Sequence, residues 1–391
     1  MRSPTPAATP TSRINRFILL VPVTFTLIAV FLARSGPTTR SHPGVPTQAT
    51  AARLLEVMNR DGLSASLDTL RWMAARDSLV LRDAHQLAHA LGRQALRQAR
   101  GSPAVLAQCR PVFAAGCYHG VVEAYLDQSR RIDMTELERM CAAAGSEQNP
   151  APVYECTHGL GHGILGALGL DLPRTLRLCD SLPDAQFASA CQEGAFMEAI
   201  GSAMAGPMHH PGGEPHGHPA MAHAGLALDP TDPYAPCDQF DGSYAASCWP
   251  FQGAVILRQS GFEPGAAFRT CDAAPARFRQ LCYRGLGLQL AGLFQRDDRW
   301  ILEQCAKGRP DLAPSCAAGA TIALTEMDWT GARTLRFCAA SRVAWKEACY
   351  RLGGSRLAFV TSPTRLAVLC GQVEGEYVEA CRESAGLVEA R

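Results

Sequence analysis

The chain has 391 residues, and its 37 Lys and Arg residues nearly balance 36 Asp and Glu residues, which leaves a formal charge of +1. A near-neutral chain gives no reason to expect nucleic acid or a strongly acidic surface as its partner. The length allows one large core or an extended array of repeats. The unusual feature is 16 cysteines, all between Cys109 and Cys381, with no Cys-x-x-Cys pair among them. This pattern favours disulfides, and hence an oxidising compartment, over structural zinc.

The N-terminus predicts export. Residues 17–33 are apolar and uncharged, and they follow two arginines. This pattern is typical of a signal peptide or an uncleaved signal anchor, and the length of the run and a poor cleavage site favour a transmembrane anchor. Positive charge before the run makes residues 1–16 a cytoplasmic tail and puts the bulk of the chain on the extracytoplasmic side, periplasmic or extracellular. Residues 34–50, rich in Pro, Ser, Thr and Gly, are expected to be a flexible linker to one domain over residues 51–391.

The cysteines reveal an internal repeat. They pair in sequence as 109/117, 141/156, 179/191, 237/248, 271/282, 305/316, 338/349 and 370/381. Each of the last five pairs has the form Cys-x10-Cys, and their second cysteines recur at intervals of 34, 34, 33 and 32 residues. An aromatic or large apolar residue stands four residues before the second cysteine in most units, and a glycine often stands three residues after it. Three coincident markers at a fixed period predict a tandem repeat protein.

Each unit is predicted to be a helical hairpin, because the segments between the markers show little β-branched alternation. We expect one helix to end at the first cysteine, a short loop to carry the aromatic residue, and a second helix to start at the second cysteine. A disulfide across the loop would staple the hairpin and stabilise it by about 2–3 kcal/mol. The glycine would let neighbouring helices approach closely.

The predicted fold is therefore all-α: a superhelix of αα-hairpin repeats, either a solenoid or a toroid, with a period of about 34 residues. A period near this value with two helices per unit resembles the tetratricopeptide superhelix. The resemblance concerns architecture alone, because the tetratricopeptide consensus of Trp, Leu-Gly and Tyr at fixed offsets is absent. It implies the fold and not the peptide binding of that family.

Ligand-type side chains recur two and six residues after the second cysteine, and these positions share one face of a helix. Asp83 lies one period of 34 residues before Cys117, and this alignment puts two upstream histidines into the same columns. The candidate metal ligands are His85, His89, His119, Glu123, His158, His162 and Glu193. The C-terminal units share the cysteines but carry almost no such residues. The set therefore predicts a site in the first four units, since positions that served the fold would persist along the array.

Imidazole and carboxylate side chains together predict a metal centre. The candidates outnumber the three or four ligands of a single zinc site, so one or two divalent ions fit. Mixed ligands of this kind favour iron, with zinc, manganese and copper as alternatives. The arrangement is similar in logic to deoxyhypusine hydroxylase, a helical-repeat protein whose di-iron centre is held by paired His-Glu motifs. The contiguous His-Glu dipeptides of that family are absent from this sequence.

A long loop over residues 204–236 interrupts the repeat. Residues 204–223 within it contain three methionines and five histidines among many Pro and Gly residues. Thioether and imidazole ligands suit copper in an oxidising compartment. The alternatives are a low-complexity segment without a role of its own, and a lid over the histidine site.

These features favour an extracytoplasmic metal-dependent enzyme. An oxidoreductase is preferred to a hydrolase, because no separate general base stands out in the sequence. Its substrate would be a small molecule or a protein, and its membrane contact would be the N-terminal anchor. The alternatives are a non-catalytic repeat scaffold for protein interaction and a copper-handling protein that uses the loop. A purely structural array would explain the disulfides but not the clustering of ligands.

Overall fold

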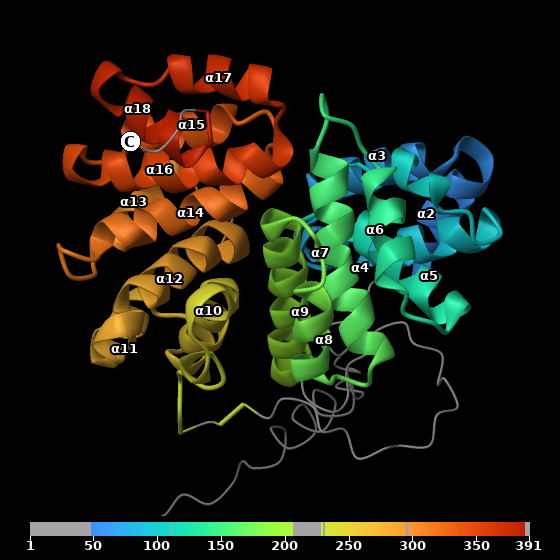
Figure 1. Ribbon diagram of the computed structural model, residues 1–391, viewed down its shortest axis with the longest axis horizontal. Coiled ribbons are helices and arrows are strands. Elements are labelled where there is room, and N and C mark those ends of the chain that lie inside the picture. The colour runs from blue at the N-terminus through green and yellow to red at the C-terminus, as the bar shows by residue number, and fades with distance from the viewer. Residues whose placement is uncertain (1–47, 111, 206–227, 230, 295–296, 388–391) are drawn as a thin grey trace, which may run out of the picture. The chain divides into compact units, whose positions relative to one another are not determined.

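The protein is built from α-helices and short 3₁₀ helices (Figure 1). The structure is a computed structural model that describes residues 48–110, 112–205, 228–229, 231–294 and 297–387. These residues contain seventeen α-helices and no β-strand. The predicted all-α class is therefore confirmed. All of the described residues belong to one compact unit, residues 45–391.

The predicted tail (1–16), anchor (17–33) and most of the linker (34–50) lie outside the described residues. The last three residues of the expected linker are described, and they belong to the first helix, α2 (Gln48–Asp61). Most of the predicted loop 204–236 lies outside the described residues as well. Among the helices that the structure does describe, none is both long enough and apolar enough to cross a membrane.

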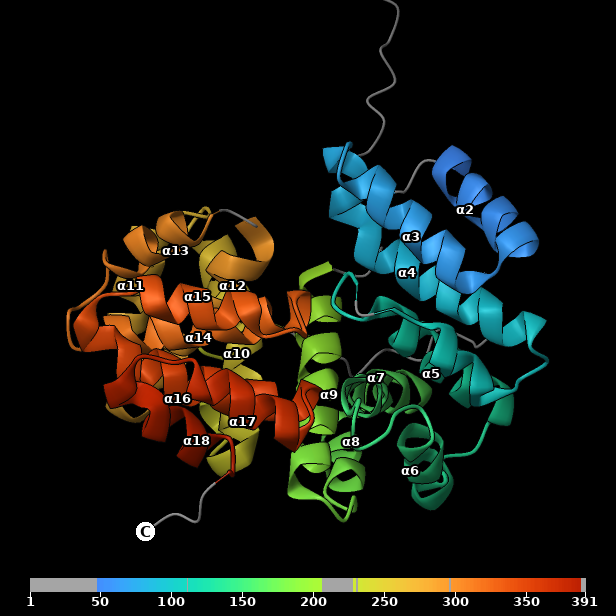
Figure 2. The same cartoon turned by 90° about the horizontal axis from the view of Figure 1, so that it is seen from above.

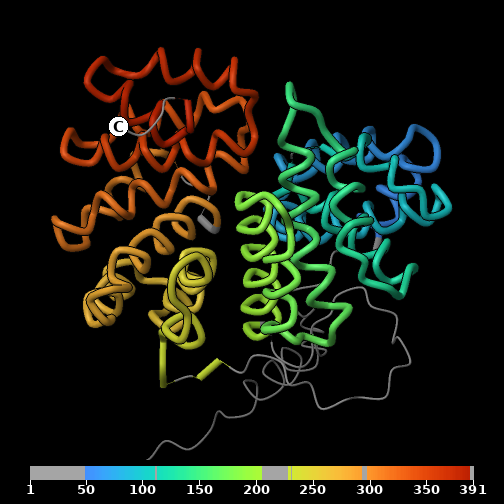
Figure 3. Tube along the Cα trace, viewed as in Figure 1, coloured from blue at the N-terminus to red at the C-terminus, as the bar shows by residue number. Residues whose placement is uncertain are grey.

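Helical hairpins follow one another along the chain, as the repeat predicts (Figure 3). The first has no cysteines and pairs α3 (Leu63–Ala74) with α4 (Ser78–Gln98). Six more consist of two α-helices each: α6 (Met134–Ala142) with α7 (Ala151–Ala167), α8 (Leu172–Cys179) with α9 (Ala185–Ala205), α11 (Pro264–Ala273) with α12 (Arg279–Phe294), α13 (Asp298–Cys305) with α14 (Ala313–Met327), α15 (Ala332–Ala340) with α16 (Val343–Val360), and α17 (Pro363–Gly371) with α18 (Val378–Ser384). In two units a 3₁₀ helix replaces the first α-helix: η1 (Pro103–Gln108) precedes α5 (Gly116–Ser129), and η2 (Cys237–Gln239) precedes α10 (Gly242–Gln259).

Every cysteine forms a disulfide with the other cysteine of its own unit, and none is free. The pairs are those predicted: 109–117, 141–156, 179–191, 237–248, 271–282, 305–316, 338–349 and 370–381. Their Cα atoms lie between 5.3 and 5.6 Å apart, which is the usual separation for a disulfide. The predicted staple across each hairpin is confirmed.

The predicted start of the second helix is wrong in most units. We expected this helix to begin at the second cysteine, yet α16 begins at Val343, ahead of Cys349, and α14 begins at Ala313, ahead of Cys316. After the chain reverses direction, the second helix runs for about one or two turns before its cysteine faces the cysteine at the end of the first helix. The aromatic residue therefore often lies inside the second helix, as Trp345 does in α16.

Glycines bring the second helices of successive hairpins into close contact. A Cβ atom added to Gly194 on α9 would lie 2.0 Å from the backbone oxygen of His158 on α7. The contact is reciprocal, because a Cβ atom on Gly161 would lie 2.0 Å from the backbone oxygen of Cys191. Any larger residue would push the two helices apart. Similar contacts elsewhere involve Gly92, Gly120, Gly253, Gly285, Gly287 and Gly319.

The C-terminal hairpins also reach back to α7. Helix α16 contacts α7 directly. Arg356 on α16 forms an ion pair of 2.9 Å with Glu193 on α9 and donates a hydrogen bond to the hydroxyl of Tyr154 on α7. Arg356 and Glu193 are 163 positions apart in the sequence. The array is therefore held by one long-range polar contact in addition to the contacts between neighbouring repeats.

Replacing Gly319 by alanine should lower the free energy of unfolding by about 3 kcal/mol, because the added methyl group would meet the backbone of α12. A Cβ atom there would lie 2.0 Å from the backbone oxygen of Arg284. The measurement is chemical denaturation followed by circular dichroism.

Gly201→Ala on α9 is the matched control, because a Cβ atom at Gly201 meets nothing within 4 Å. This variant should raise the free energy of unfolding by about 0.5–1 kcal/mol through helix propensity. Equal effects of the two substitutions would contradict the close packing.

Candidate metal site

Five histidines from three neighbouring second helices converge in one cluster. The three helices, α4, α5 and α7, follow one another in Figure 2. His85 and His89 come from α4, His119 from α5, and His158 and His162 from α7. Two groups of three could each hold a metal ion: His85 with His89 and His119, and His119 with His158 and His162. In each group, one ring nitrogen of every member lies within 4.8 Å of the others. The predicted histidines are thus brought together, and His119 belongs to both groups.

The helical spacing and the glycines explain this convergence. The pairs on α4 and on α7 are spaced i and i+4, so each pair shares one face of its helix. A Cβ atom on Gly120 would lie 2.0 Å from the backbone oxygen of His89, and one on Gly159 would lie 3.3 Å from the Cα atom of His119. The helices are close enough for rings from adjacent helices to touch. The ring centroids of His119 and His162 lie 4.7 Å apart.

Three of the imidazoles are held by oxygen acceptors on the outer side of the ring. His85 Nδ1 donates to the backbone oxygen of Phe113 at 2.6 Å. His89 Nδ1 lies 3.1 Å from a carboxylate oxygen of Glu123, and His162 Nδ1 lies 3.1 Å from a carboxylate oxygen of Glu198. A carbonyl or carboxylate oxygen accepts a hydrogen bond, so these partners place the proton on Nδ1. Each of these rings then keeps a lone pair on Nε2.

Five of the remaining ring nitrogens face one another or have no hydrogen-bond partner among the described residues. The Nε2 atoms of His85 and His89 lie 3.1 Å apart, so two lone pairs meet there. His162 Nε2 and both ring nitrogens of His119 are buried without a hydrogen-bond partner among the described residues. Buried polar atoms are nearly always satisfied, and each exception needs an explanation. A cation bound between the rings would satisfy these nitrogens together.

Burial also keeps three of the rings neutral. It lowers the pKa of His85 to about 3, and the neighbouring His89 adds to the shift. Burial likewise lowers the pKa values of His119 and His158 well below the usual value, and His162 adds to both shifts. The neutral imidazole is the form that binds a metal, so the cluster is ready to bind one at neutral pH.

Glu123 lies behind His89, with both carboxylate oxygens engaged. One oxygen lies 3.1 Å from His89 Nδ1, and the other accepts a hydrogen bond of 2.7 Å from Arg93. Burial acts to raise the pKa of Glu123, but His89 and Arg93 outweigh it and lower the pKa to about 2. The carboxylate is therefore ionised and fixes the orientation of the His89 ring.

Glu193 lies away from the imidazole groups. Its carboxylate pairs with Arg356 at 2.9 Å and accepts a hydrogen bond of 3.0 Å from the hydroxyl of Tyr154. Neither of the two groups of potential metal ligands includes it. The sequence placed Glu193 in the ligand column, but from the sequence alone nothing indicated that an arginine 163 positions away would engage its carboxylate.

Two acids near the cluster were not predicted from the sequence: Glu155, which is buried, and Glu326, which is partly buried. Glu155 on α7 lies with one carboxylate oxygen 4.0 Å from His119 Nε2, and burial raises its pKa well above the usual value, with a further contribution from Glu326. Glu326 lies 3.7 Å from Arg356, and burial raises its pKa to about 7. Glu155 is the one charged residue in α7, which is a usable signal. Glu326 carried no signal, because its partner comes from another hairpin.

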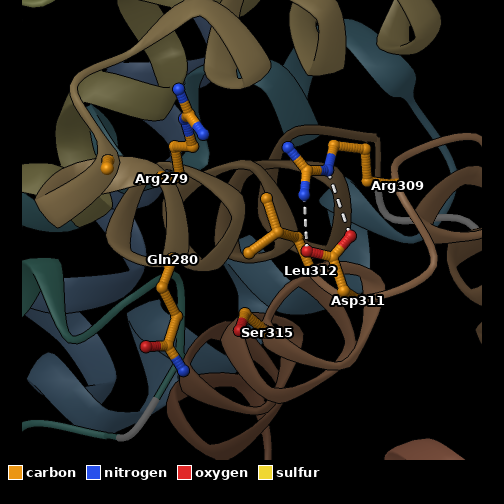
Figure 4. A pocket seen from close by; sticks show the side chains of 7 residues that line it. Arg279, Gln280, Arg309, Asp311, Leu312 and Ser315 are labelled. Atoms are coloured by element: carbon orange, nitrogen blue, oxygen red, sulfur yellow. Dashed lines mark hydrogen bonds and ion pairs between the residues drawn. The ribbon is translucent and has the colours of Figure 1, made fainter.

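A separate surface pocket lies near α12 and the start of α14 (Figure 4). It is lined by Ala276, Arg279, Gln280, Arg309, Asp311, Leu312 and Ser315. Arg309 and Asp311 form an ion pair of 2.7 Å with each other there. No candidate metal ligand lines this pocket, so the histidine cluster remains the candidate functional site.

The chain matches no protein-family model, no curated protein and no solved structure. Its function therefore has to be inferred from the chemistry of the cluster and from the fold that builds it.

Replacing His119 by leucine should raise the free energy of unfolding of the metal-free protein by about 1–3 kcal/mol. The substitution removes two buried ring nitrogens that have no hydrogen-bond partner in the described part of the chain, and it keeps an apolar side chain of similar volume in their place. Denaturation in the presence of a chelator measures the effect.

Gln289→Leu is the matched control. Gln289 is similarly buried, but its amide donates to the backbone oxygen of Pro250 at 2.9 Å. Its replacement should cost about 1–3 kcal/mol, because that oxygen loses its donor. A loss of stability in His119→Leu as large as that in the control would contradict the account of the cluster.

Proposed function

We propose that the five histidines bind a divalent metal centre of one or two ions, and that the chain is an extracytoplasmic metal-dependent oxidoreductase with iron as the expected metal. The observation that carries the proposal is the set of unpartnered ring nitrogens that face one another at the centre of the cluster. The eight disulfides support an oxidising, extracytoplasmic environment.

The oxygen partners behind the rings support the proposal. Histidines that bind a metal usually donate the other ring N–H to a carboxylate or a backbone carbonyl, which fixes the tautomer and the ring orientation. Glu123, Glu198 and the backbone of Phe113 serve His89, His162 and His85 in this way. Without a cation, each buried nitrogen without a partner would cost about 1–3 kcal/mol.

The roles proposed for two acids differ from those expected from the sequence. We assign Glu123 to orienting His89, since both of its oxygens are engaged by protein side chains. We assign Glu193 to the contact with Arg356 and Tyr154. The metal ligands proposed from the original set are then the five histidines.

Burial of the cluster favours oxidation over hydrolysis. His119 is 1% exposed and His162 is 4% exposed, so bulk water is excluded from the centre. A redox metal would supply dioxygen activation in such a site, whereas a Lewis-acid metal would supply an activated water. His85 is the least buried of the five, and it marks the side from which a small molecule can approach. A hydrolase is the alternative within the same proposal.

The test is metal analysis of the full-length chain, purified without added metal and measured by mass spectrometry. We expect at least one divalent ion per chain, with iron predominant. His119→Leu should remove most of it, because His119 belongs to both ligand groups. The double variant His209→Ala/His210→Ala, in the predicted loop 204–236 outside the described residues, is the control and should keep the metal.

Two results would overturn the proposal. The first is a folded, metal-free chain that binds no divalent ion on titration. The second is copper that is retained in His119→Leu and lost in the loop variant, which would favour the copper-handling alternative. A metal-free chain would leave the non-catalytic scaffold as the better interpretation.

A further inference from the structure

We propose that Glu155 is a direct ligand of the same metal centre and adds a carboxylate next to the imidazole of His119. This inference rests on the proposed function and goes beyond it, since it gives the centre a mixed nitrogen and oxygen ligand set. Glu155 lies outside the two ligand columns that the repeat defines, directly before Cys156 on α7.

The carboxylate of Glu155 is buried and has few polar partners. The residue is 4% exposed, and its Oε1 atom has no hydrogen-bond partner in the described part of the chain. Its one ion-pair contact among the described residues is His119 Nε2, 4.0 Å from Oε2. That distance is too long for a hydrogen bond. A buried carboxylate is costly unless it is paired or binds a metal.

The other carboxylates near the cluster each have protein partners. Glu123 pairs with Arg93 and His89. Glu193 pairs with Arg356. The remaining two are Glu198, which contacts His162 and Ser202, and Glu326, which lies 3.7 Å from Arg356. Glu155 has no ion-pair contact shorter than 4.0 Å in the described structure, although the charge of Arg356 and the indole of Trp329 both act to lower the pKa of its carboxyl. A cation next to His119 would supply the ion-pair partner.

The spacing between Glu155 and His119 suits a shared ion. Protein nitrogen and oxygen ligands lie about 2.0–2.2 Å from a metal, so two ligands of one ion are about 3–4 Å apart. The 4.0 Å between Glu155 Oε2 and His119 Nε2 falls at the upper end of that range. Both ring nitrogens of His119 are without partners in the described structure, so Nε2 is available for this contact.

A carboxylate in the ligand set bears on the identity of the metal. Five imidazoles alone suit copper or zinc as well as iron, whereas two histidines with one carboxylate form the set used by non-haem iron oxygenases. Glu155 together with His119 and one further imidazole would supply such a set. The proposed ligand therefore strengthens the choice of iron within the proposed function.

The test uses the full-length chain, freed of metal by a chelator and titrated with Co²⁺, whose visible absorption reports its ligands. Glu155→Gln keeps the size of the side chain and removes the charged ligand. We expect its Co²⁺ affinity to fall at least about tenfold, with a change in the shape of the visible spectrum. Thermal unfolding of the metal-free variant should occur no lower than in the unsubstituted chain, because the amide has no charged form to bury.

Glu326→Gln is the control, since Glu326 is a nearby, partly buried acid that contacts Arg356 and, among the described residues, no imidazole. It should bind Co²⁺ with an unchanged spectrum and without the loss of affinity expected for Glu155→Gln. If Glu155→Gln fails to fold, Glu155→Asp is the second variant. It keeps the charge on a side chain that is shorter by one methylene group, and it should also weaken Co²⁺ binding and alter the spectrum.

The outcomes separate this inference from the proposal on which it rests. Co²⁺ binding by Glu155→Gln with unchanged affinity and spectrum would overturn the role of Glu155 and leave the histidine centre intact. Weaker binding with an unchanged spectrum would show that Glu155 acts by charge alone, and would also overturn its role as a ligand. No Co²⁺ binding by the unsubstituted chain would overturn the metal centre itself.

Discussion

The close approach of the second helices is the constraint on which the rest of the structure depends. At Gly120 and Gly194 no atom larger than hydrogen fits between one helix and the backbone of the next. Imidazole is a short side chain, so rings on adjacent helices come into contact most readily where the helices pack closely. Because the glycines narrow this spacing, His89, His119 and His162 lie close enough for their rings to contact one another. The scaffold therefore sets the geometry of the site through residues that have no side chain.

The outer ring nitrogens of the cluster have hydrogen-bond partners, whereas several of the inner ring nitrogens have none in the described part of the chain. Glu123 and Glu198 fix the outer nitrogens of two rings, and Arg93 holds Glu123 in turn. The inner nitrogens are left unpartnered at the centre of the cluster. Such an arrangement is costly for a metal-free protein, and the eight disulfides are well suited to offset that cost, because each one restricts the unfolded chain. The disulfides and the unpartnered nitrogens therefore have opposite effects on the stability of the metal-free protein.

Much of the fold could be predicted from the sequence, because the cysteine period is a local signal. The pairing of Cys305 with Cys316, and of every other pair, follows from spacing alone. The histidine cluster could also be predicted, since the i and i+4 pairs share the register of the cysteines. The contacts of the acids could not. Arg356 pairs with Glu193 from 163 positions away. A periodic sequence pattern does not predict a contact between residues that are several hairpins apart. The exact start of each second helix was also missed, because it depends on how many residues the chain needs to reverse direction.

The contact of α16 with α7 limits how this array can change in length. Repeat proteins of the open kind can gain or lose terminal units, since each unit contacts only its neighbours. Here Arg356 is the cation that pairs with the partly buried carboxylate of Glu193, and it comes from a hairpin near the C-terminal end of the sequence. Adding or removing a hairpin between them would shift the guanidinium away from its partner and leave a partly buried carboxylate without its cation. The number of hairpins between Glu193 and Arg356 is therefore fixed by electrostatics, which makes the array a unit of defined size.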